Sequence, residues 1–218
     1  MKRIIISDLH IGSKFYKEEE LISFLKSIEY DQLILAGDII DFIKIPIFTA
    51  RTAELVRSID FSKDILYIVG NHDYALKAFR GEKFMRMTFL DKYEFKEGGR
   101  KFRVEHGDRY ETGLVHRNLL IKIISIFQDC IERTFNIDLS SWYVNYKIKR
   151  RKLRRIWDIL KRNEDVDVLI MGHAHCPECI IWVDQEQVIK TYVNSGDWVS
   201  HASYVEINNG VVRLRKYD

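Results

Sequence analysis

Residues 3–10 of the chain read Arg-Ile-Ile-Ile-Ser-Asp-Leu-His, so a run of branched apolar residues changes at once into a polar motif. A short apolar run of this kind is typical of a strand that is buried on both faces. The same change follows four further runs, which span residues 32–36, 65–69, 102–105 and 167–171. We therefore predict a set of buried strands that carry polar side chains at their C-terminal ends.

The polar motifs after these runs are the candidates for a functional site. They are Asp8-Leu9-His10, Gly37-Asp38, Gly70-Asn71-His72-Asp73, His106-Gly107-Asp108 and Gly172-His173-Ala174-His175. In an open α/β sheet the strand fixes the backbone, and the loop after it aims side chains into a crevice shared with its neighbours. Motifs that lie far apart in the sequence can therefore converge on one site.

Each motif alone is weak evidence, because aspartates and glycines also make turns, and a single histidine is more often a hydrogen-bonded loop residue. Together, however, the motifs hold five of the seven histidines. A cluster of imidazoles and carboxylates at strand ends needs a charge to organise it. A pair of divalent metal ions is the simplest explanation, and ligation by imidazole and oxygen without thiolate favours Mn, Fe or Zn.

The 218 residues are 46% hydrophobic and 31% charged, with a net charge of +3, which is ordinary for a globular protein. We expect a single domain over residues 1–218, with an insertion at residues 110–163. The apolar start is too short for a signal peptide, and no apolar run reaches the ~18 residues that span a bilayer. Three cysteines do not form a disulfide framework. These features predict a cytoplasmic protein.

The spacing of apolar residues predicts helices over residues 18–28 and 52–59, so strands and helices alternate in the first half of the chain. Residues 188–193, 204–207 and 211–214 are predicted strands, and Asn208-Asn209-Gly210 predicts a hairpin between the last two. The insertion contains no proline and only one glycine, Gly113, which favours helix.

The insertion joins an apolar part to a basic part. Residues 114–135 hold too many apolar side chains for one helix face, and residues 147–162 carry nine basic residues and one acidic residue. One interpretation is a helix docked on the core with a solvated basic face. The other, which we prefer, is a lid that lies against an anionic membrane and admits acyl chains beside the site. Nucleic acid could use the same basic face but is not the expected partner.

In their order and spacing, the five motifs resemble those of the calcineurin-like metallophosphoesterases, and the resemblance extends from Asp8 to His175. It implies an α/β fold in which two mixed β-sheets form an α/β/β/α sandwich with a helical insertion. It also implies a dinuclear site in which Asp8, His10 and His175 bind one metal, Asn71, His106 and His173 bind the other, and Asp38 bridges the two. Asn71, His72 and His173 are then expected against the substrate.

Two cations of this kind can hold a phosphoryl group and activate a water, so no protein nucleophile is required. His72 is not counted as a ligand and is the candidate general acid. The resemblance implies that Asp41, three residues after Asp38, orients it. The alternative interpretation is that Asp41 caps a helix and that His72 only orients a ligand.

Within the family, the compact length, the insertion and Asn194-Ser195-Gly196-Asp197-Trp198 resemble the UDP-2,3-diacylglucosamine diphosphatases of lipid A synthesis. This resemblance implies Mn-dependent hydrolysis of a pyrophosphate to UMP and 2,3-diacylglucosamine 1-phosphate, at the periphery of the inner membrane. Two features depart from the best-known branch. His72 stands where that branch has arginine, and residues 109–113 lack its aspartates. The alternative is a generic phosphodiesterase or phosphatase that acts on another nucleotide or phospholipid.

Other functions fit the sequence less well. A serine/threonine protein phosphatase would have Arg-Gly after Asp41, where this chain has Phe42 and Ile43. A non-catalytic metal-site scaffold would be expected to have lost ligands.

The pair of cysteines in residues 176–179 would need two more ligands to hold zinc, so we interpret it as incidental. His116 and His201 belong to no motif and are expected in surface or packing roles.

Overall fold

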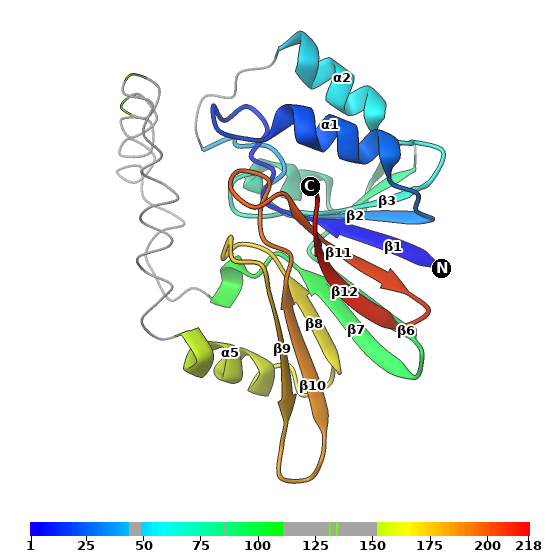
Figure 1. Cartoon of the computed structure of the whole chain (residues 1–218), viewed down its shortest axis with the longest axis vertical. Coiled ribbons are helices and arrows are strands. Elements are labelled where there is room, and N and C mark those ends of the chain that lie inside the picture. Colours follow the sequence, from blue (N-terminus) through cyan, green and yellow to red (C-terminus); the bar gives the residue numbers. More distant parts are fainter. Residues whose placement is uncertain (44–48, 85, 111–130, 132–133, 135–151) are drawn as a thin grey trace.

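The computed structural model describes residues 1–43, 49–84, 86–110, 131, 134 and 152–218, which form two β-sheets packed face to face (Figure 1). The first sheet has the strand order β12-β11-β1-β2-β3-β5-β4. Its members are β1 (Lys2–Ile6), β2 (Gln32–Ala36), β3 (Asp64–Ile68), β4 (Lys83–Phe84), β5 (Met87–Leu90), β11 (Ser203–Asn208) and β12 (Val211–Lys216). The pairings β1–β2, β2–β3 and β3–β5 are parallel, and the others are antiparallel.

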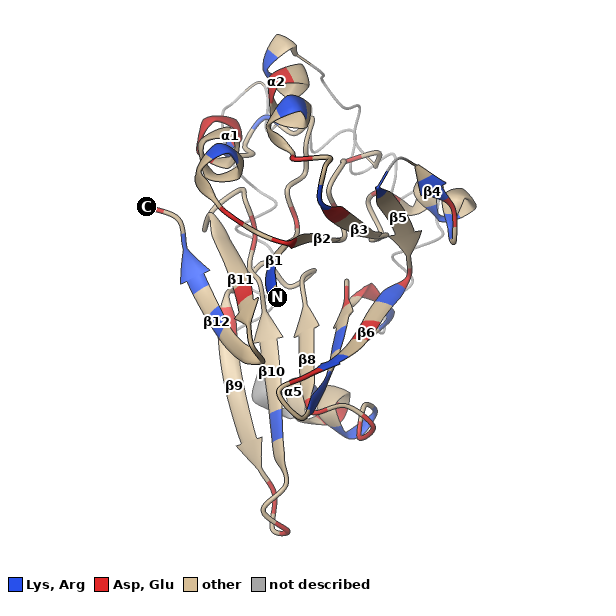
Figure 2. Cartoon of the chain, turned by 90° about the vertical axis from the view of Figure 1, so that its right-hand side faces the viewer, with Lys and Arg blue, Asp and Glu red and all other residues tan. Residues whose placement is uncertain are grey.

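The second sheet has the strand order β6-β7-β8-β10-β9 and is also mixed. Its members are β6 (Lys92–Glu97), β7 (Arg100–Glu105), β8 (Val168–Met171), β9 (Glu178–Val183) and β10 (Ile189–Asn194). β7, β8 and β10 run parallel, whereas β6 and β9 pair antiparallel at the two edges. Along β6, lysines and glutamates alternate, as Figure 2 shows.

Helices cover the outer face of each sheet. On the first sheet, α1 (Glu18–Ser27) and α2 (Ala50–Ser58) lie side by side (Figures 1 and 2), and Phe24 of α1 is buried there against Trp198. On the second sheet, α5 (Lys152–Lys161) buries Ile156, Ile159 and Leu160 against β8 and β10. Two 3₁₀ helices, η1 (Tyr74–Phe79) and η2 (Asp108–Tyr110), follow β3 and β7.

The central core lies between the two sheets and is almost entirely branched aliphatic. Ile5 and Ile34 of the first sheet pack there with Phe102 and Ile170 of the second, and all four are fully buried. Fully burying one such side chain stabilises the folded state by about 1.5–3 kcal/mol. The strands of this core are buried on both faces, which explains their continuous apolar sequences.

The predicted fold of two mixed sheets with flanking helices is confirmed. The predicted strands and helices of the first half and of the C-terminus are present within one or two residues, including the hairpin at Asn209, where φ is +50°. The sequence did not predict β4, β5, β6 and β9. These lie at or near sheet edges and are partly exposed, so they lack the continuous apolar pattern.

Most of the predicted insertion at residues 110–163 lies outside the described residues, as do His116, Cys130 and Gly113. The described part, α5, is an amphipathic helix docked on the second sheet, and Trp157 stacks on Trp182 of β9 with ring centroids 4.1 Å apart. Among the described residues, no helix has the length and apolar character needed to cross a membrane.

Candidate metal centre

The five motifs meet because the two sheets bring their parallel strand ends to the same end of the sandwich. The turn after β1 is held to the turn after β2 by a hydrogen bond from the Asp8 amide to the Gly37 carbonyl, 3.0 Å. It is held to the turn after β8 by the His173 amide, which donates to the Asp8 carboxylate at 2.9 Å. The Gly172 amide in turn donates to the His106 carbonyl after β7, 3.1 Å. The loops therefore form one continuous hydrogen-bonded assembly.

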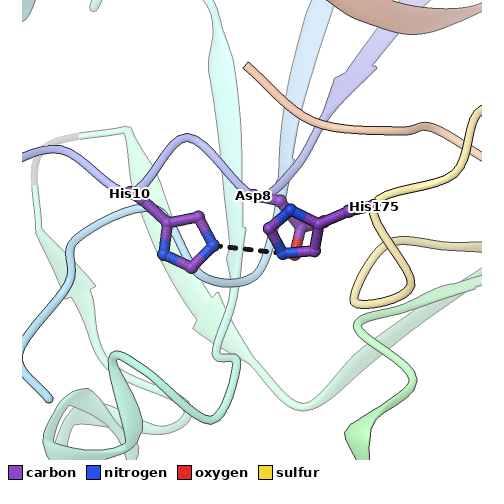
Figure 3. A group of neighbouring side chains, drawn as sticks. All are labelled: Asp8, His10 and His175. Atoms are coloured by element: carbon purple, nitrogen blue, oxygen red, sulfur yellow. Dashed lines mark hydrogen bonds and ion pairs between the residues drawn. The ribbon is translucent and has the colours of Figure 1, made fainter. Parts of the chain in front are cut away.

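Asp8, His10 and His175 form the first cluster of potential ligands (Figure 3). The Nε2 atoms of His10 and His175 lie 3.3 Å apart, and the His175 Nε2 also lies 3.3 Å from Asp8 Oδ1. Ser7 fixes the other oxygen of that carboxylate by a hydrogen bond from its hydroxyl, 2.5 Å. The Asp8 and His10 side chains are buried, and that of His175 is 23% exposed.

Asp38, His106 and His173 form the second cluster, with Asn71 beside it. His106 Nε2 lies 3.2 Å from Asp38 Oδ2 and 3.1 Å from Asn71 Oδ1. The other ring nitrogen, Nδ1, lies 3.0 Å from the Ala36 carbonyl oxygen, to which it can donate. His106 and His173 meet edge to face with ring centroids 5.0 Å apart. The backbone of β2 therefore orients His106 so that Nε2 points at Asp38.

The donor sets fit divalent cations. Ligand bonds of about 2.1 Å at angles of 90–109° place neighbouring donor atoms roughly 3.0–3.4 Å apart. The separations of His175 Nε2 from His10 Nε2 and Asp8 Oδ1 fall in that interval, and so does that of His106 Nε2 from Asp38 Oδ2. Two imidazole nitrogens facing each other across 3.3 Å have at most one proton to share, whereas a cation between them satisfies both. The residues present are thus able to hold two metal ions.

The backbone at this site is unusual. Non-glycine residues rarely have positive φ, but five candidate ligands do, with φ between +49° and +62°. They are Asp8, His10, Asp38, His173 and His175. Each such residue costs about 1–3 kcal/mol, and conformations of this kind persist at functional sites where the surrounding structure enforces them. The local strain is therefore concentrated where the chemistry is expected.

Two glycines allow the turns to approach so closely. A Cβ at Gly37, where φ is +91°, would lie 2.3 Å from His106 Nδ1, and a Cβ at Gly172 would lie 2.4 Å from Asp8 Oδ2. Any other residue at either position would displace a candidate ligand. Packing therefore requires glycine at both positions, and at Gly37 the positive φ requires it as well.

The electrostatics of the metal-free cluster are those of a cation site. Burial lowers the pKa of His10, but the hydrogen bond and charge of Asp41 and the charges of Asp38 and Asp8 raise it to about 9. Burial likewise lowers the pKa of His106, and the charge and hydrogen bond of Asp38 raise it to about 10. Burial raises the pKa of Asp38, but the facing histidines hold it well below its usual range. Without metal, protons thus supply the positive charge that the carboxylates need.

His72 and Asp41 are in direct contact. His72 Nδ1 lies 2.9 Å from Asp41 Oδ1, and the ring remains 25% exposed. Although burial raises the pKa of Asp41, hydrogen bonds from His10 and His72 hold it well below its usual range. Asp41 also lies 3.6 Å from His10 Nδ1, so one carboxylate faces two rings. Among the described helices, none begins at Asp41.

Asp73 supports the centre, although no role there was predicted for it from the sequence. Asp73 is fully buried and accepts hydrogen bonds from the Gly70 and Ile39 amides and the Tyr67 hydroxyl. Burial and the charge of Asp38 raise the pKa of Asp73. Its position inside the Gly70-Asn71-His72-Asp73 motif is the signal that could have identified it.

The structure supports no special role for the two cysteines of residues 176–179. Cys179 is exposed in β9, whose strand begins at Glu178. Neither cysteine belongs to a group of potential metal ligands among the described residues.

A two-sheet α/β sandwich with imidazoles and carboxylates gathered at the strand ends is the arrangement expected of the metallophosphoesterase class. The sequence profile of the Calcineurin-like phosphoesterase family matches residues 1–177, and the chain belongs to that family. It is accordingly a metal-dependent phosphoester hydrolase.

A curated relative agrees with this assignment, and two solved structures agree with the fold. The chain is 25% identical, over 93% of its length and 93% of theirs, to UDP-2,3-diacylglucosamine hydrolase of Vibrio cholerae serotype O1, strain El Tor Inaba N16961. Its fold is similar to that of Vacuolar Protein Sorting 29 from Cryptosporidium parvum, with a TM-score of 0.50 and 12% identity, over 99% of this chain and 95% of that one. Vps29 of Chaetomium thermophilum matches with the same TM-score and coverages and 14% identity.

Proposed function

We propose that the protein hydrolyses the pyrophosphate of UDP-2,3-diacylglucosamine, releasing UMP and 2,3-diacylglucosamine 1-phosphate, with two Mn²⁺ ions as cofactors. The observation that carries the proposal is the complete ligand set, combined with the likeness to UDP-2,3-diacylglucosamine hydrolase over nearly the whole chain. The late motif in residues 194–198 and the insertion between the last two ligand motifs support the same substrate.

In this proposal Asp8, His10 and His175 hold one ion, Asn71, His106 and His173 the other, and Asp38 contributes to both. The distances around His10 and His106 support this division into two groups. Two bound divalent ions supply positive charge that holds phosphoryl oxygens and acidifies a water. Asn71, His72 and His173 border the position that the phosphate would take.

His72 is the proposed general acid. Asp41 accepts from the Nδ1 side of the ring, which leaves Nε2 on the side of Asp38, 3.9 Å from its carboxylate. A proton on Nε2 can then pass to the oxygen that leaves phosphorus, after which the ring is neutral. The partial exposure of His72 supports this role, because a proton donor must reach both substrate and solvent.

We further propose that residues 110–163 act as a lid within the single domain and contact an anionic membrane, which would place a cytoplasmic protein at the inner membrane. α5 buries its apolar residues on β8 and β10 and leaves Arg155 and Lys161 exposed, as is Arg162 directly after the helix. Such a face can attract anionic headgroups, although this segment alone equally fits a docked helix with a solvated basic face.

Substrate hydrolysis with defined metals tests the proposal. Purified protein, stripped of metal and reloaded with Mn²⁺, Fe²⁺ or Zn²⁺, is assayed on UDP-2,3-diacylglucosamine, on a water-soluble nucleotide pyrophosphate and on an aryl phosphodiester. We expect selective turnover of the lipid substrate, and Asp38→Asn should abolish it. Equal turnover of the soluble compounds would instead favour a generic phosphodiesterase or phosphatase. The differences from the best-known diphosphatase branch, at His72 and at residues 109–113, are compatible with that alternative. Stoichiometric metal without any hydrolysis would indicate a scaffold.

A further inference from the structure

The segment between β10 and β11 is a motif whose purpose the reaction itself does not explain. It crosses from the second sheet to the first directly behind the Asp8 turn. The Trp198 amide donates to the Asp8 carbonyl at 3.1 Å, and the Ser195 amide donates to the Met171 carbonyl at 2.8 Å. The Ser195 hydroxyl lies 2.7 Å from that of Ser7. The crossing therefore connects the two turns that carry Asp8 and His175.

Asp197 is the charged residue in this crossing, and its side chain is 1% exposed. One carboxylate oxygen, Oδ1, accepts hydrogen bonds from the backbone amides of Val199, Ser200 and His201, at 2.8, 2.5 and 3.3 Å. The other, Oδ2, faces two imidazoles. His201 Nδ1 lies 2.6 Å from it, and His175 Nδ1 lies 3.8 Å from it. The carboxylate is thus fixed by the backbone on one side and available to histidine on the other.

The orientation of His175 makes this contact informative. Its Nε2 atom faces Asp8 and His10, so its Nδ1 atom is the one that faces Asp197. A neutral imidazole carries its proton on only one nitrogen, and only the other can bind a metal. A carboxylate next to Nδ1 favours the proton there and leaves Nε2 with its lone pair free.

We infer that Asp197 is a positioning residue, which sets the tautomer and direction of His175 so that Nε2 is presented to the metal position of Asp8 and His10. The inference rests on the proposed metal site but not on the proposed substrate. His201 is hydrogen-bonded to Oδ2 of Asp197, whereas His175 faces the same oxygen at 3.8 Å and interacts with it through charge.

The alternative is that Asp197 only caps its own turn. Asp197→Asn separates the two roles, because the amide oxygen can still accept the three backbone hydrogen bonds. The amide nitrogen, however, is a donor and would face His175 Nδ1. That ring is then driven to protonate Nε2, which cannot bind metal. Asp184→Asn is a matched control, since the partly exposed Asp184 likewise accepts from the Glu186 and Val188 amides, at 2.9 and 2.8 Å.

Mn²⁺ titration of metal-free protein is the first measurement. We expect Asp197→Asn to weaken one of two binding events about 10–100-fold, and Asp184→Asn to leave both unchanged. His175→Ala should weaken the same event, and adding Asp197→Asn to it should weaken that event little further. Wild-type affinity at both positions in Asp197→Asn would overturn the inference, as would a loss that is fully additive with His175→Ala.

The ¹⁵N chemical shifts of the histidine rings in metal-free wild-type protein provide a second measurement that needs no variant. We expect His175 to be protonated at Nδ1 and unprotonated at Nε2. A ring protonated at Nε2 would overturn the inference even if every variant failed to fold. Because neither measurement uses a substrate, failure of the proposed lipid hydrolysis would leave this result intact.

Discussion

His72→Asn tests the proton-donor role most directly, because it removes the ring and leaves every proposed metal ligand in place. Asp41 is less suitable for this purpose, since its carboxylate also faces His10 Nδ1 at 3.6 Å and its loss would disturb a ligand. General acid catalysis contributes about 10²–10⁴-fold to rate, which corresponds to roughly 3–5 kcal/mol of transition-state stabilisation. The 2.9 Å contact with Asp41 holds the ring in one orientation, so we expect a loss within that range.

The assay compares two phosphodiesters that differ only in the leaving group. An alkoxide departs poorly without a proton, whereas a nitrophenolate departs well without one. We therefore expect His72→Asn to slow the alkyl substrate about 10³-fold and the nitrophenyl substrate less than about tenfold. Mn content, measured on the same preparations, should equal that of the wild type.

Two results would refute this reasoning. An equal loss on both substrates would mean that His72 contacts the phosphoryl oxygens rather than the leaving group. A lower Mn content in the His72→Asn protein than in the wild type would mean that His72 supports the metal site and is not the acid.

Three further predictions follow from the packing and charges of the centre. Gly172→Ala forces a methyl group against Asp8, so it should destabilise the metal-free protein by roughly 1–3 kcal/mol in urea unfolding and weaken Mn²⁺ binding in a titration. Trp198 is fully buried, and its indole N–H has no acceptor among the described residues. Trp198→Phe should therefore cost less than about 1.5 kcal/mol where Trp198→Ala costs about 3–5, measured by thermal unfolding. Because the folded pKa values of His10 and His106 are raised to about 9 and 10, their stabilising effect is complete below pH ~6.5. It is lost as the pH rises through those values, so the metal-free protein should unfold at lower temperature at pH 9.5 than at pH 6.5, and a flat profile would contradict the assignment.

The fold could be read from the sequence where burial is complete on both faces. β1, β2, β3 and β8 are continuous branched apolar runs, and each ends at a motif, so both the strands and their polar ends were predictable. Edge strands such as β9 expose half or more of their residues, and their register depends on partners that no local pattern reveals.

The supporting residues of the centre were harder to predict for a related reason. Asp197 and His201 follow a strand like the other motifs, but the crossing between sheets that brings Asp197 to His175 is a property of the topology. The left-handed backbone at His10 and His173 was likewise not predictable, because histidine and aspartate give no local signal for positive φ of the kind that glycine gives. Tertiary hydrogen bonds, such as that from the His10 amide to the Asp38 carbonyl, enforce it.

The positive φ angles of the five candidate ligands have a consequence for metal binding. Hydrogen bonds from neighbouring loops hold their conformation, so we expect the site to be largely formed before a cation binds. Capture should then proceed with little chain rearrangement, unlike in small zinc domains that fold only around their metal. Exchange of one divalent ion for another should consequently be reversible in the native state. The ion bound in the cell would then depend on which metals are available there.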